Sequence, residues 1–563
     1  MRTFDWIVLI SSLIFIVLYG VWKGRGSKDL KGYLLANRSL KWHTIALSIM
    51  ATQASAITFI SGPGQAYVDG MRFVQFYFGL PLAMIILCIT AIPIYHKLNV
   101  YTAYEYLENR FDYNTRALAS FLFLVQRGLA AGLTIYAPSI ILSIILGWNL
   151  YWTNLIVGGL VIIYTTSGGT KAVNMTHFYQ MLIIMLGMLG AFYMVIRLLP
   201  SDVSFFDAAN IAGRMGRINT IDFEFDLTNR YNIWSGIIGG LFLQLSYFGT
   251  DQSQVQRYLT GKSMAHSRMG LVFNGFIKIP MQFFILFVGI LVFVFYQFET
   301  PPLFFNTVET KDIRSSIYAE QYSRLEKEHK RLSTEKQDQL HALSNAIDRQ
   351  SGYEIKQIEK EIGNSTQKLS QVREQAVSLL QANNPDMDPS DINYIFLTFV
   401  VNFLPVGLVG LVIAAIISAS MSSTSGELNA LASTTIVDIY KRVVKKDGEE
   451  RHYVWASKII TLSWGLYAIL LAQYASRLGS LIEAVNILGS LFYGTILGIF
   501  LVAFYLKWIK GKATFFAAIL AEIAVVICFL FTDLSFLWYN VVGCLGVMLF
   551  ASILQPLIPG KKD

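Results

Sequence analysis

Apolar stretches of roughly 20 residues recur along almost the whole chain, from Phe4 nearly to Pro559. A stretch of that length can cross the hydrocarbon core of a bilayer as a helix, which satisfies all of its own backbone hydrogen bonds. Of the 563 residues, 54% are hydrophobic and 15% are charged, a balance outside that of ordinary soluble domains. The sequence therefore predicts an all-α integral membrane protein.

We count thirteen candidate transmembrane helices. The ninth apolar segment is too long for one span and contains Pro405, so we expect a short surface helix to about Phe403 and then a membrane helix. The first segment lacks a basic leader and a small-residue cleavage site, so we expect it to remain as a helix. The segments are 4–22, 43–68, 73–95, 117–147, 151–168, 176–198, 231–256, 268–297, 392–438, 454–475, 479–506, 513–532 and 536–557.

Lysine and arginine gather in alternate loops, as the positive-inside rule describes. Six of them lie between Lys23 and Lys41, and the same side of the membrane receives the basic residues near 97–110, 171, 262–268, 441–446 and 507–512, and Lys561 and Lys562. The formal charge of +8 is therefore a signature of membrane orientation and not of nucleic-acid binding. We expect a multi-pass protein of the cell (inner or plasma) membrane, with the N-terminus outside and the C-terminus in the cytoplasm.

Residues 309–388 interrupt the apolar pattern with a charged, helical segment that this topology places outside the cell. Two narrow apolar stripes flank a break at Ser351-Gly352, which predicts an antiparallel helical hairpin. The stripes are Leu325, Leu332, Leu340, Leu343 and Ile347, and Ile355, Ile358, Ile362, Leu369 and Val372. The favoured interpretation is a solvated spacer, and the alternative is a docking surface for a partner protein.

Five serines and a threonine crowd into the stretch SASMSSTSGELN, residues 418–429. On a helix, Ala419, Ser422 and Ser423 share one face, which presents two hydroxyls and a carbonyl beside a small side chain. Small residues and serines also allow helices to pack closely in membranes, so this pattern alone leaves two interpretations open. The patch has no carboxylate, which disfavours a divalent metal, whereas sodium needs only a few neutral oxygens.

Two spans contain interruptions of the kind that mark binding sites in transporters. The span 43–68 contains Gly62-Pro63-Gly64, and the span 231–256 runs into TDQSQVQRYLTGKS. These spans head two sets of five helices, which predicts an inverted repeat. The expected organisation is 1–42, an extra helix and first inner loop; 43–198, the first repeat; 199–230, an external loop; 231–308, the start of the second repeat; 309–388, the hairpin insert; 389–510, the rest of the second repeat; and 511–563, two C-terminal helices.

Outside the insert, the chain resembles the sodium:solute symporter family over essentially its whole length. Four motifs in the family's order carry the resemblance: YTAYEYLENRF (101–111), SGGTKAVNMTHFYQ (167–180), TDQSQVQRYLTGKS (250–263) and SASMSSTSGELNALASTTIVDIYKR (418–442). The resemblance implies a LeuT-like fold of five plus five inverted helices, with substrate and sodium held side by side in mid-membrane. It also implies sodium ligands at Ala51, Ala54, Ala419, Ser422 and Ser423.

Some family members hold a second sodium, and this sequence departs from their pattern. His177 stands at an expected aspartate and Gly426 at an expected serine, so a single sodium site is predicted. A histidine is a poor substitute for a hard anionic ligand. Two interpretations of His177 stay open: a hydrogen-bonded core residue and a proton relay.

The substrate site of the family maps onto residues of six core helices. The matching residues are Gln53, Ser55, Thr58, Phe76, Tyr77, Asp251, Gln252, Lys278 and Asn486. A lysine within a span needs a partner, and we expect Asp251 to pair with Lys278 in a pocket suited to a hydroxyl-rich ligand. Sugar-carrying relatives have a lysine matching Lys278, whereas relatives that carry sialate use an arginine where Ala130 stands, one turn from Arg127. The YEYLE motif resembles the monocarboxylate and vitamin branch.

The favoured function is a sodium-coupled symporter that imports a small polar organic solute, a sugar or sugar acid, by alternating access. The alternatives are a sodium-coupled monocarboxylate or vitamin-type anion symporter, a proton-coupled transporter that uses His177, and a membrane sensor. A phosphate-binding G-x-x-x-x-G-K loop is absent from the sequence, which disfavours an ATP-driven pump. An enzyme is not expected, because the sequence shows no nucleophile–base pair or metal-type cluster.

Overall fold

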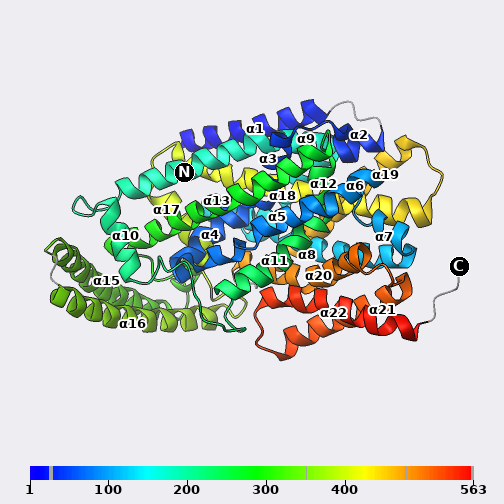
Figure 1. Cartoon of the computed structure of the whole chain (residues 1–563). Helices are drawn as coiled ribbons and strands as arrows, with labels where there is room; N and C mark the ends of the chain where they lie inside the picture. Colours follow the sequence, from blue (N-terminus) through cyan, green and yellow to red (C-terminus); the bar gives the residue numbers. More distant parts are fainter. Residues whose placement is uncertain (25–28, 350–351, 476–479, 559–563) are drawn as a thin grey trace.

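The computed structural model describes residues 1–24, 29–349, 352–475 and 480–558. These residues form a bundle of helices that run lengthwise side by side (Figure 1). The elements are α1 Thr3–Gly24, α2 Leu30–Leu35, η1 Ala36–Arg38, α3 Trp42–Gln53, α4 Ala56–Asp69, η2 Gly70–Tyr77, α5 Leu80–Ile89, α6 Ala91–Leu98, α7 Glu105–Arg110, α8 Tyr113–Leu146, α9 Leu150–Arg197, α10 Phe205–Arg214, η3 Ser235–Gly239, α11 Gly240–Gly249, α12 Gln252–Leu259, α13 Met264–Phe298, α14 Thr307–Ile313, α15 Ala319–Asp348, α16 Gly352–Asn383, α17 Ile392–Phe403, α18 Leu408–Thr434, η4 Thr435–Val444, α19 Glu450–Ala472, α20 Leu481–Tyr505, α21 Gly511–Phe531 and α22 Phe536–Leu557.

Within the described residues, ten helical segments are long and apolar enough to cross a membrane. Three shorter apolar helices lie at Leu150–Ile163, Ser235–Gly249 and Ile392–Phe403. The expected count of thirteen spans is therefore not confirmed by length and composition. One reason is that the predicted span 43–68 is divided into α3 and α4, of 12 and 14 residues, neither of which is long enough alone.

The interruption of this span does not lie where the sequence pattern placed it. The helix breaks at Ala54–Ser55, whereas Gly62-Pro63-Gly64 lies inside α4. The two glycines instead allow close packing: a Cβ on Gly64 would lie 2.1 Å from the backbone oxygen of Ile392, and one on Gly62 would lie 3.3 Å from Ile285. The second interruption occurs as expected, between the end of α11 and the start of α12.

Gly64→Ala is expected to destabilise the protein by about 1–3 kcal/mol, because the added methyl group overlaps backbone that cannot move aside as a side chain can. The melting temperature of the detergent-solubilised protein measures this loss. Gly159→Ala is the matched control, since no described atom outside its own stretch of helix lies within 4 Å of a Cβ added there. Equal melting temperatures for the two variants would contradict the packing argument.

Two further breaks shape the bundle. The predicted spans 151–168 and 176–198 both belong to α9, which is broken at Gly169 (φ 58°) against the ring and backbone of Tyr33. The predicted division near Pro405 separates α17 from α18, and Asp5 of α1 accepts hydrogen bonds from the Gly407 and Gly410 N–H groups at the start of α18. However, α17 is not a surface helix, because most of its side chains are buried against its neighbours.

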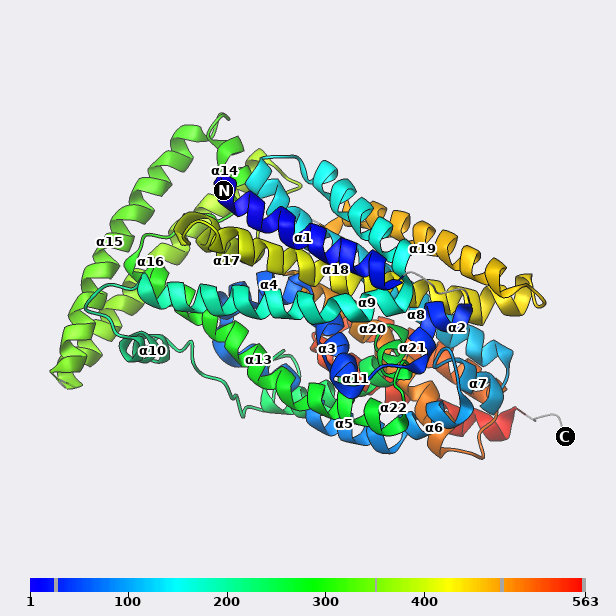
Figure 2. The same cartoon turned by 90° about the horizontal axis from the view of Figure 1, so that it is seen from above.

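The charged segment lies across one end of the bundle, where α15 and α16 run side by side (Figures 1 and 2). Their apolar residues Leu332 and Val372 pack with Tyr322, Ala376 and Leu380. The N-terminus lies toward the same end, whereas α2, α6, α7 and the connection from α18 to α19 lie at the other end (Figure 2). Ser351 of the predicted break, together with Arg25, Lys28, Lys561 and Lys562, lies outside the described residues.

Candidate sodium and substrate site

The break between α3 and α4 frees backbone carbonyls in the middle of the protein. The last hydrogen bond of α3 runs from the Ala54 N–H to the Met50 carbonyl, so the carbonyls that follow Met50 lack helical partners. Ala54 itself has non-helical dihedral angles (φ −87°, ψ 75°). Both Ala51 and Ala54 are fully buried. A cation can therefore be offered main-chain oxygens here without the loss of a helical hydrogen bond.

α18 brings its hydroxyls against this break. The Ser422 Oγ lies 2.8 Å from the Ala51 carbonyl oxygen and 2.8 Å from the Ala419 carbonyl oxygen. The Ser423 Oγ lies 3.1 Å from the same Ala419 oxygen. Four of the five predicted sodium-site residues thus contribute oxygens to one buried cluster, and Ala54 lies at the adjoining helix end. The donor set is neutral oxygen throughout, which suits a monovalent hard cation.

Gly426 and His177 both lie at contacts between helices. A Cβ on Gly426 would lie 3.3 Å from the Thr52 methyl group, so a serine there would press on α3. The His177 Nδ1 lies 2.9 Å from the Ser48 hydroxyl, and its Nε2 lies 3.3 Å from the Ser422 carbonyl oxygen. His177 is fully buried and joins α3 to α18 directly behind the serine cluster.

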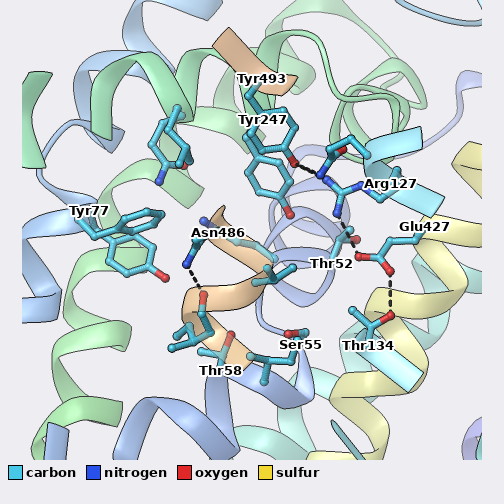
Figure 3. Close-up of a pocket in the computed structure, with 18 residues that line it drawn as sticks. Thr52, Ser55, Thr58, Tyr77, Arg127, Thr134, Tyr247, Glu427, Asn486 and Tyr493 are labelled. Atoms are coloured by element: carbon cyan, nitrogen blue, oxygen red, sulfur yellow. Dashed lines mark hydrogen bonds and ion pairs between the residues drawn. The ribbon is translucent and has the colours of Figure 1, made fainter. Parts of the chain in front are cut away.

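A central cavity of about 90 Å³ adjoins the break. Six of the nine predicted substrate residues line it: Gln53, Ser55, Thr58, Phe76, Tyr77 and Asn486. Figure 3 shows Ser55 and Thr58 on one side of this cavity and Tyr247 and Tyr493 on the other. This volume is well below the roughly 300–1,000 Å³ of typical small-molecule sites, so the cavity is a narrow form of such a site.

The other three predicted residues do not line this cavity. The Gln252 side chain accepts from the Ala103 N–H (3.1 Å) and donates to the Tyr101 carbonyl (2.9 Å), which ties α12 to the segment before α7. Lys278 is fully buried, and its Nζ lies 5.5 Å from the centre of the Tyr77 ring. The expected pair between Lys278 and Asp251 does not form, because Arg127 binds Asp251 instead.

Arg127 is the centre of a buried charged network in the cavity wall. Its guanidinium forms ion pairs with Asp251 and, at 3.1 Å, with Glu427. Tyr493 lies 2.5 Å from the same guanidinium and donates to Asp251 at 2.9 Å. The Thr134 hydroxyl donates to the other oxygen of Glu427 at 2.9 Å. Figure 3 shows Arg127 between Tyr493 and Glu427, with Thr134 beyond Glu427.

This network joins four helices that are far apart in the sequence: α8, the start of α12, α18 and α20. Buried charges are tolerated when each is paired and hydrogen-bonded, which is the case for both carboxylates here. Motif matching did not assign Arg127, Glu427 or Tyr493 to the site. The available signal was the presence of Arg127 and Glu427 inside apolar segments, since an ionisable residue at membrane depth marks a functional site by default.

Three glutamine side chains of the cavity have unused hydrogen-bonding groups. The Oε1 atoms of Gln53 and Gln126, and both polar atoms of Gln244, are buried without a hydrogen-bond partner among the described residues. A buried amide without partners costs free energy unless a ligand or water satisfies it. The cavity therefore offers both donors and acceptors to a bound molecule.

The model of the sodium:solute symporter family matches residues 33–312 and 381–521. The chain belongs to the sodium:solute symporter family. Membership places it among sodium-coupled membrane transporters, with sodium as the transported ion, and not among enzymes. Most of α15 and α16, residues 313–380, falls between the two matched ranges.

Curated relatives agree with this family. The chain is 26% identical to sodium-coupled monocarboxylate transporter 1 of Xenopus laevis and 26% identical to the sodium-dependent multivitamin transporter of Oryctolagus cuniculus, over 88% of this chain in each case. The alignments cover 66% and 65% of those relatives, so the chain spans about two thirds of their length. A solved Na⁺-coupled sialic acid symporter has the same fold, with a TM-score of 0.76 at 23% identity over 100% of this chain and 99% of the other.

Proposed function

We propose that this protein couples sodium entry to the import of a small, neutral, hydroxyl-rich solute of the sugar class by alternating access. The observation that carries the proposal is that Arg127 is already paired with two carboxylates, while Gln53, Gln126 and Gln244 have unused hydrogen-bonding groups. Hydroxyl groups both donate and accept, so a sugar can satisfy amides of both orientations. The volume of about 90 Å³ fits an alternating mechanism, because the site must widen on one side to admit a solute.

Charge balance supports a neutral solute. With all three groups ionised, Arg127, Asp251 and Glu427 carry a net charge of −1. Glu427 follows the proposed sodium ligand Ser423 by one helical turn, so a sodium ion held by Ala51, Ala54, Ala419, Ser422 and Ser423 would offset this charge. Within the Arg127 network a neutral solute then leaves the charge balanced, whereas an anionic solute would restore the excess of negative charge there.

The second candidate is a monocarboxylate or vitamin-type anion. The names of the curated relatives favour it, and so does the guanidinium of Arg127 in the cavity wall, since arginine binds carboxylates in a planar, bidentate manner. The same guanidinium is one turn from Ala130, where the resemblance places the arginine of sialate carriers. An anion would compete with Asp251 and Glu427 for the two terminal nitrogens of Arg127, whereas the buried Nε has no hydrogen-bond partner among the described residues.

Uptake into proteoliposomes tests both candidates. We expect uptake of a neutral sugar from a panel that also contains acidic sugars and monocarboxylates, and we expect it to be lost when choline replaces sodium. Glu427→Gln should improve the uptake of carboxylate solutes relative to neutral ones, because it removes the carboxylate that pairs with one terminal nitrogen of Arg127. Glu299→Gln at the end of α13 is the control. Uptake that is unchanged in choline would refute sodium coupling, and uptake of monocarboxylates alone would refute the sugar class.

One sodium ion per solute is expected. Gly426 and His177 occupy the positions where the resemblance implies a second site, and both are used in contacts between helices. His177→Ala should therefore leave the stoichiometry at one, as measured from the reversal potential of sodium-driven flux. Two sodium ions per solute would contradict this expectation, and a new dependence on the proton gradient in the wild type would favour proton coupling through His177.

The proposed orientation has the N-terminus and the α15–α16 hairpin outside and the C-terminus in the cytoplasm of a cell (inner or plasma) membrane. The basic loops that carry this assignment lie at one end of the bundle, away from the hairpin (Figure 2). The proposed organisation of the chain is an extra N-terminal helix, two inverted repeats, the insert and two C-terminal helices. Cysteine labelling at the hairpin and at the loop between α18 and α19 in intact cells would test this topology.

A further inference from the structure

A second cavity, of about 450 Å³, lies between the α15–α16 hairpin and the ends of α4 and α13. It shares no lining residue with the central cavity. Most of its wall on the hairpin side comes from residues that the family model does not match. The cavity is therefore a feature of this chain's insert, separate from the transport site.

Polar side chains from both hairpin helices face this cavity at helical spacing. His329, Ser333 and Lys336 of α15 lie four and three residues apart, so they share one face of the helix. Arg373 faces the cavity from α16, and Arg217 faces it from the loop after α10. The apolar stripes of the hairpin are thus interrupted by a basic stretch directed inward toward the transporter.

The positive charge of the cavity is only partly balanced. Its one lining carboxylate, Asp391, forms an ion pair with Arg373 and accepts the Phe305 N–H at 2.6 Å. In the described part of the chain, neither Arg217 nor Lys336 has a carboxylate within 4 Å. Arg217 donates to the Val68 carbonyl and has Asp69 as a more distant counter-charge, whereas Lys336, only 8% exposed, has no carboxylate nearby among the described residues. The partly enclosed space therefore keeps an excess of positive charge.

The cavity also contains unused hydrogen-bonding groups. The hydroxyls of Ser333 and Ser390 and the Nε of Arg217 are buried without a hydrogen-bond partner among the described residues. Ser333 is 5% exposed and lies between His329 and Lys336 on the face of α15 that lines the cavity. A buried donor without an acceptor is unfavourable, and each of these three groups can donate to an oxygen.

We propose that this cavity binds a phosphate-type oxyanion, which the Lys336 and Arg217 cations hold together with the Ser333 and Ser390 hydroxyls. A tetrahedral oxyanion matches the excess of positive charge, and its several oxygens match several separate donors. The bound group would connect the hairpin to the loop after α10 and to the segment just before α17. The same chemistry is found in free phosphate and in a lipid phosphate headgroup, and the test separates these sources.

The protonation of the lining groups fits this proposal. Burial and the neighbouring Arg217 lower the pKa of Lys336 to about 8, and burial together with Arg373 and Lys336 lowers the pKa of His329 to about 4. At neutral pH His329 is therefore uncharged and Lys336 is still protonated. A bound anion would favour the charged form of Lys336 and raise its pKa.

The experiment uses the full-length protein in a neutral detergent at pH 7 and constant ionic strength. Inorganic phosphate should raise the melting temperature of the wild type relative to chloride, because a ligand that binds only the folded state stabilises it. Equilibrium dialysis with radiolabelled phosphate measures binding directly. Lys336→Met should raise the melting temperature without phosphate, since it removes an unpaired buried cation, and should reduce phosphate binding at least tenfold.

Two further variants keep the proposal testable. Ser333→Ala removes one hydroxyl with little change in packing and should weaken binding several-fold, whereas Lys327→Met, an exposed position on α15, should leave binding unchanged. Stabilisation by a short-chain phosphatidic acid but not by inorganic phosphate, lost in Lys336→Met, would support the proposal with a lipid as the source. Equal effects of phosphate on the wild type and on Lys336→Met would show an adventitious ion only and would overturn the proposal. The absence of any effect of inorganic phosphate and of phosphatidic acid on the wild type would also overturn the proposal.

Discussion

Arg127→Met is expected to abolish solute uptake and to destabilise the protein by about 3–5 kcal/mol. The substitution leaves Asp251 and Glu427 buried without their counter-charge, and removal of one partner from a buried ion pair costs this much. It also removes the hydrogen bond from Arg127 to Tyr493 of α20, which leaves Gln126 as the α8 donor to Tyr493. Thermal melting in detergent measures the loss of stability, and uptake into proteoliposomes measures the loss of transport.

The charge argument predicts a specific rescue. Arg127→Met combined with Glu427→Gln and Asp251→Asn should regain most of the stability, because no buried charge is left uncompensated. Arg324→Met, at an exposed position on α15, is the control and should behave as the wild type. Wild-type stability of the single Arg127 variant would contradict the network, and failure of the triple variant to regain stability would show that the arginine acts through packing alone.

Ser423→Ala and Ser422→Ala are each expected to raise the sodium concentration for half-maximal uptake by about 10- to 100-fold. Each removes one oxygen from the cluster around the Ala419 carbonyl, and a hydrogen-bond-like contact with a charged group contributes about 1.5–3 kcal/mol. The measurement is uptake as a function of sodium concentration at saturating solute.

Ser433→Ala provides the matched control on the same helix. Its hydroxyl is also buried, but among the described residues it donates to the Ala430 carbonyl of its own helix and to no other group, so the sodium dependence should not change. An unchanged half-saturation in both Ser422→Ala and Ser423→Ala would place sodium elsewhere. A change of equal size in Ser433→Ala would indicate a general effect on α18 and not a lost ligand.

Part of the site follows from local sequence pattern. Ala419, Ser422 and Ser423 share a helical face because of the 3.6-residue repeat, and the structure brings that face to the Ala51 carbonyl. The position of the α3 break did not follow in the same way. Gly62-Pro63-Gly64 is the strongest local breaking signal, yet α4 continues through it because Gly62 and Gly64 are needed for contact with α13 and α17.

The sequence by itself determined that the chain is an α-helical membrane protein, which family it belongs to, and where three small residues form an oxygen-rich face. Apolar length, helical period and ordered motifs are local properties, so they can be read without a fold. Only the tertiary structure decided that Arg127, and not Lys278, pairs with Asp251, and that Lys336 and Arg217 meet beneath the hairpin. Both juxtapositions join residues more than 100 positions apart, and both depend on how the helices pack. A buried charge such as Asp251 pairs with whichever opposite charge packing brings within reach.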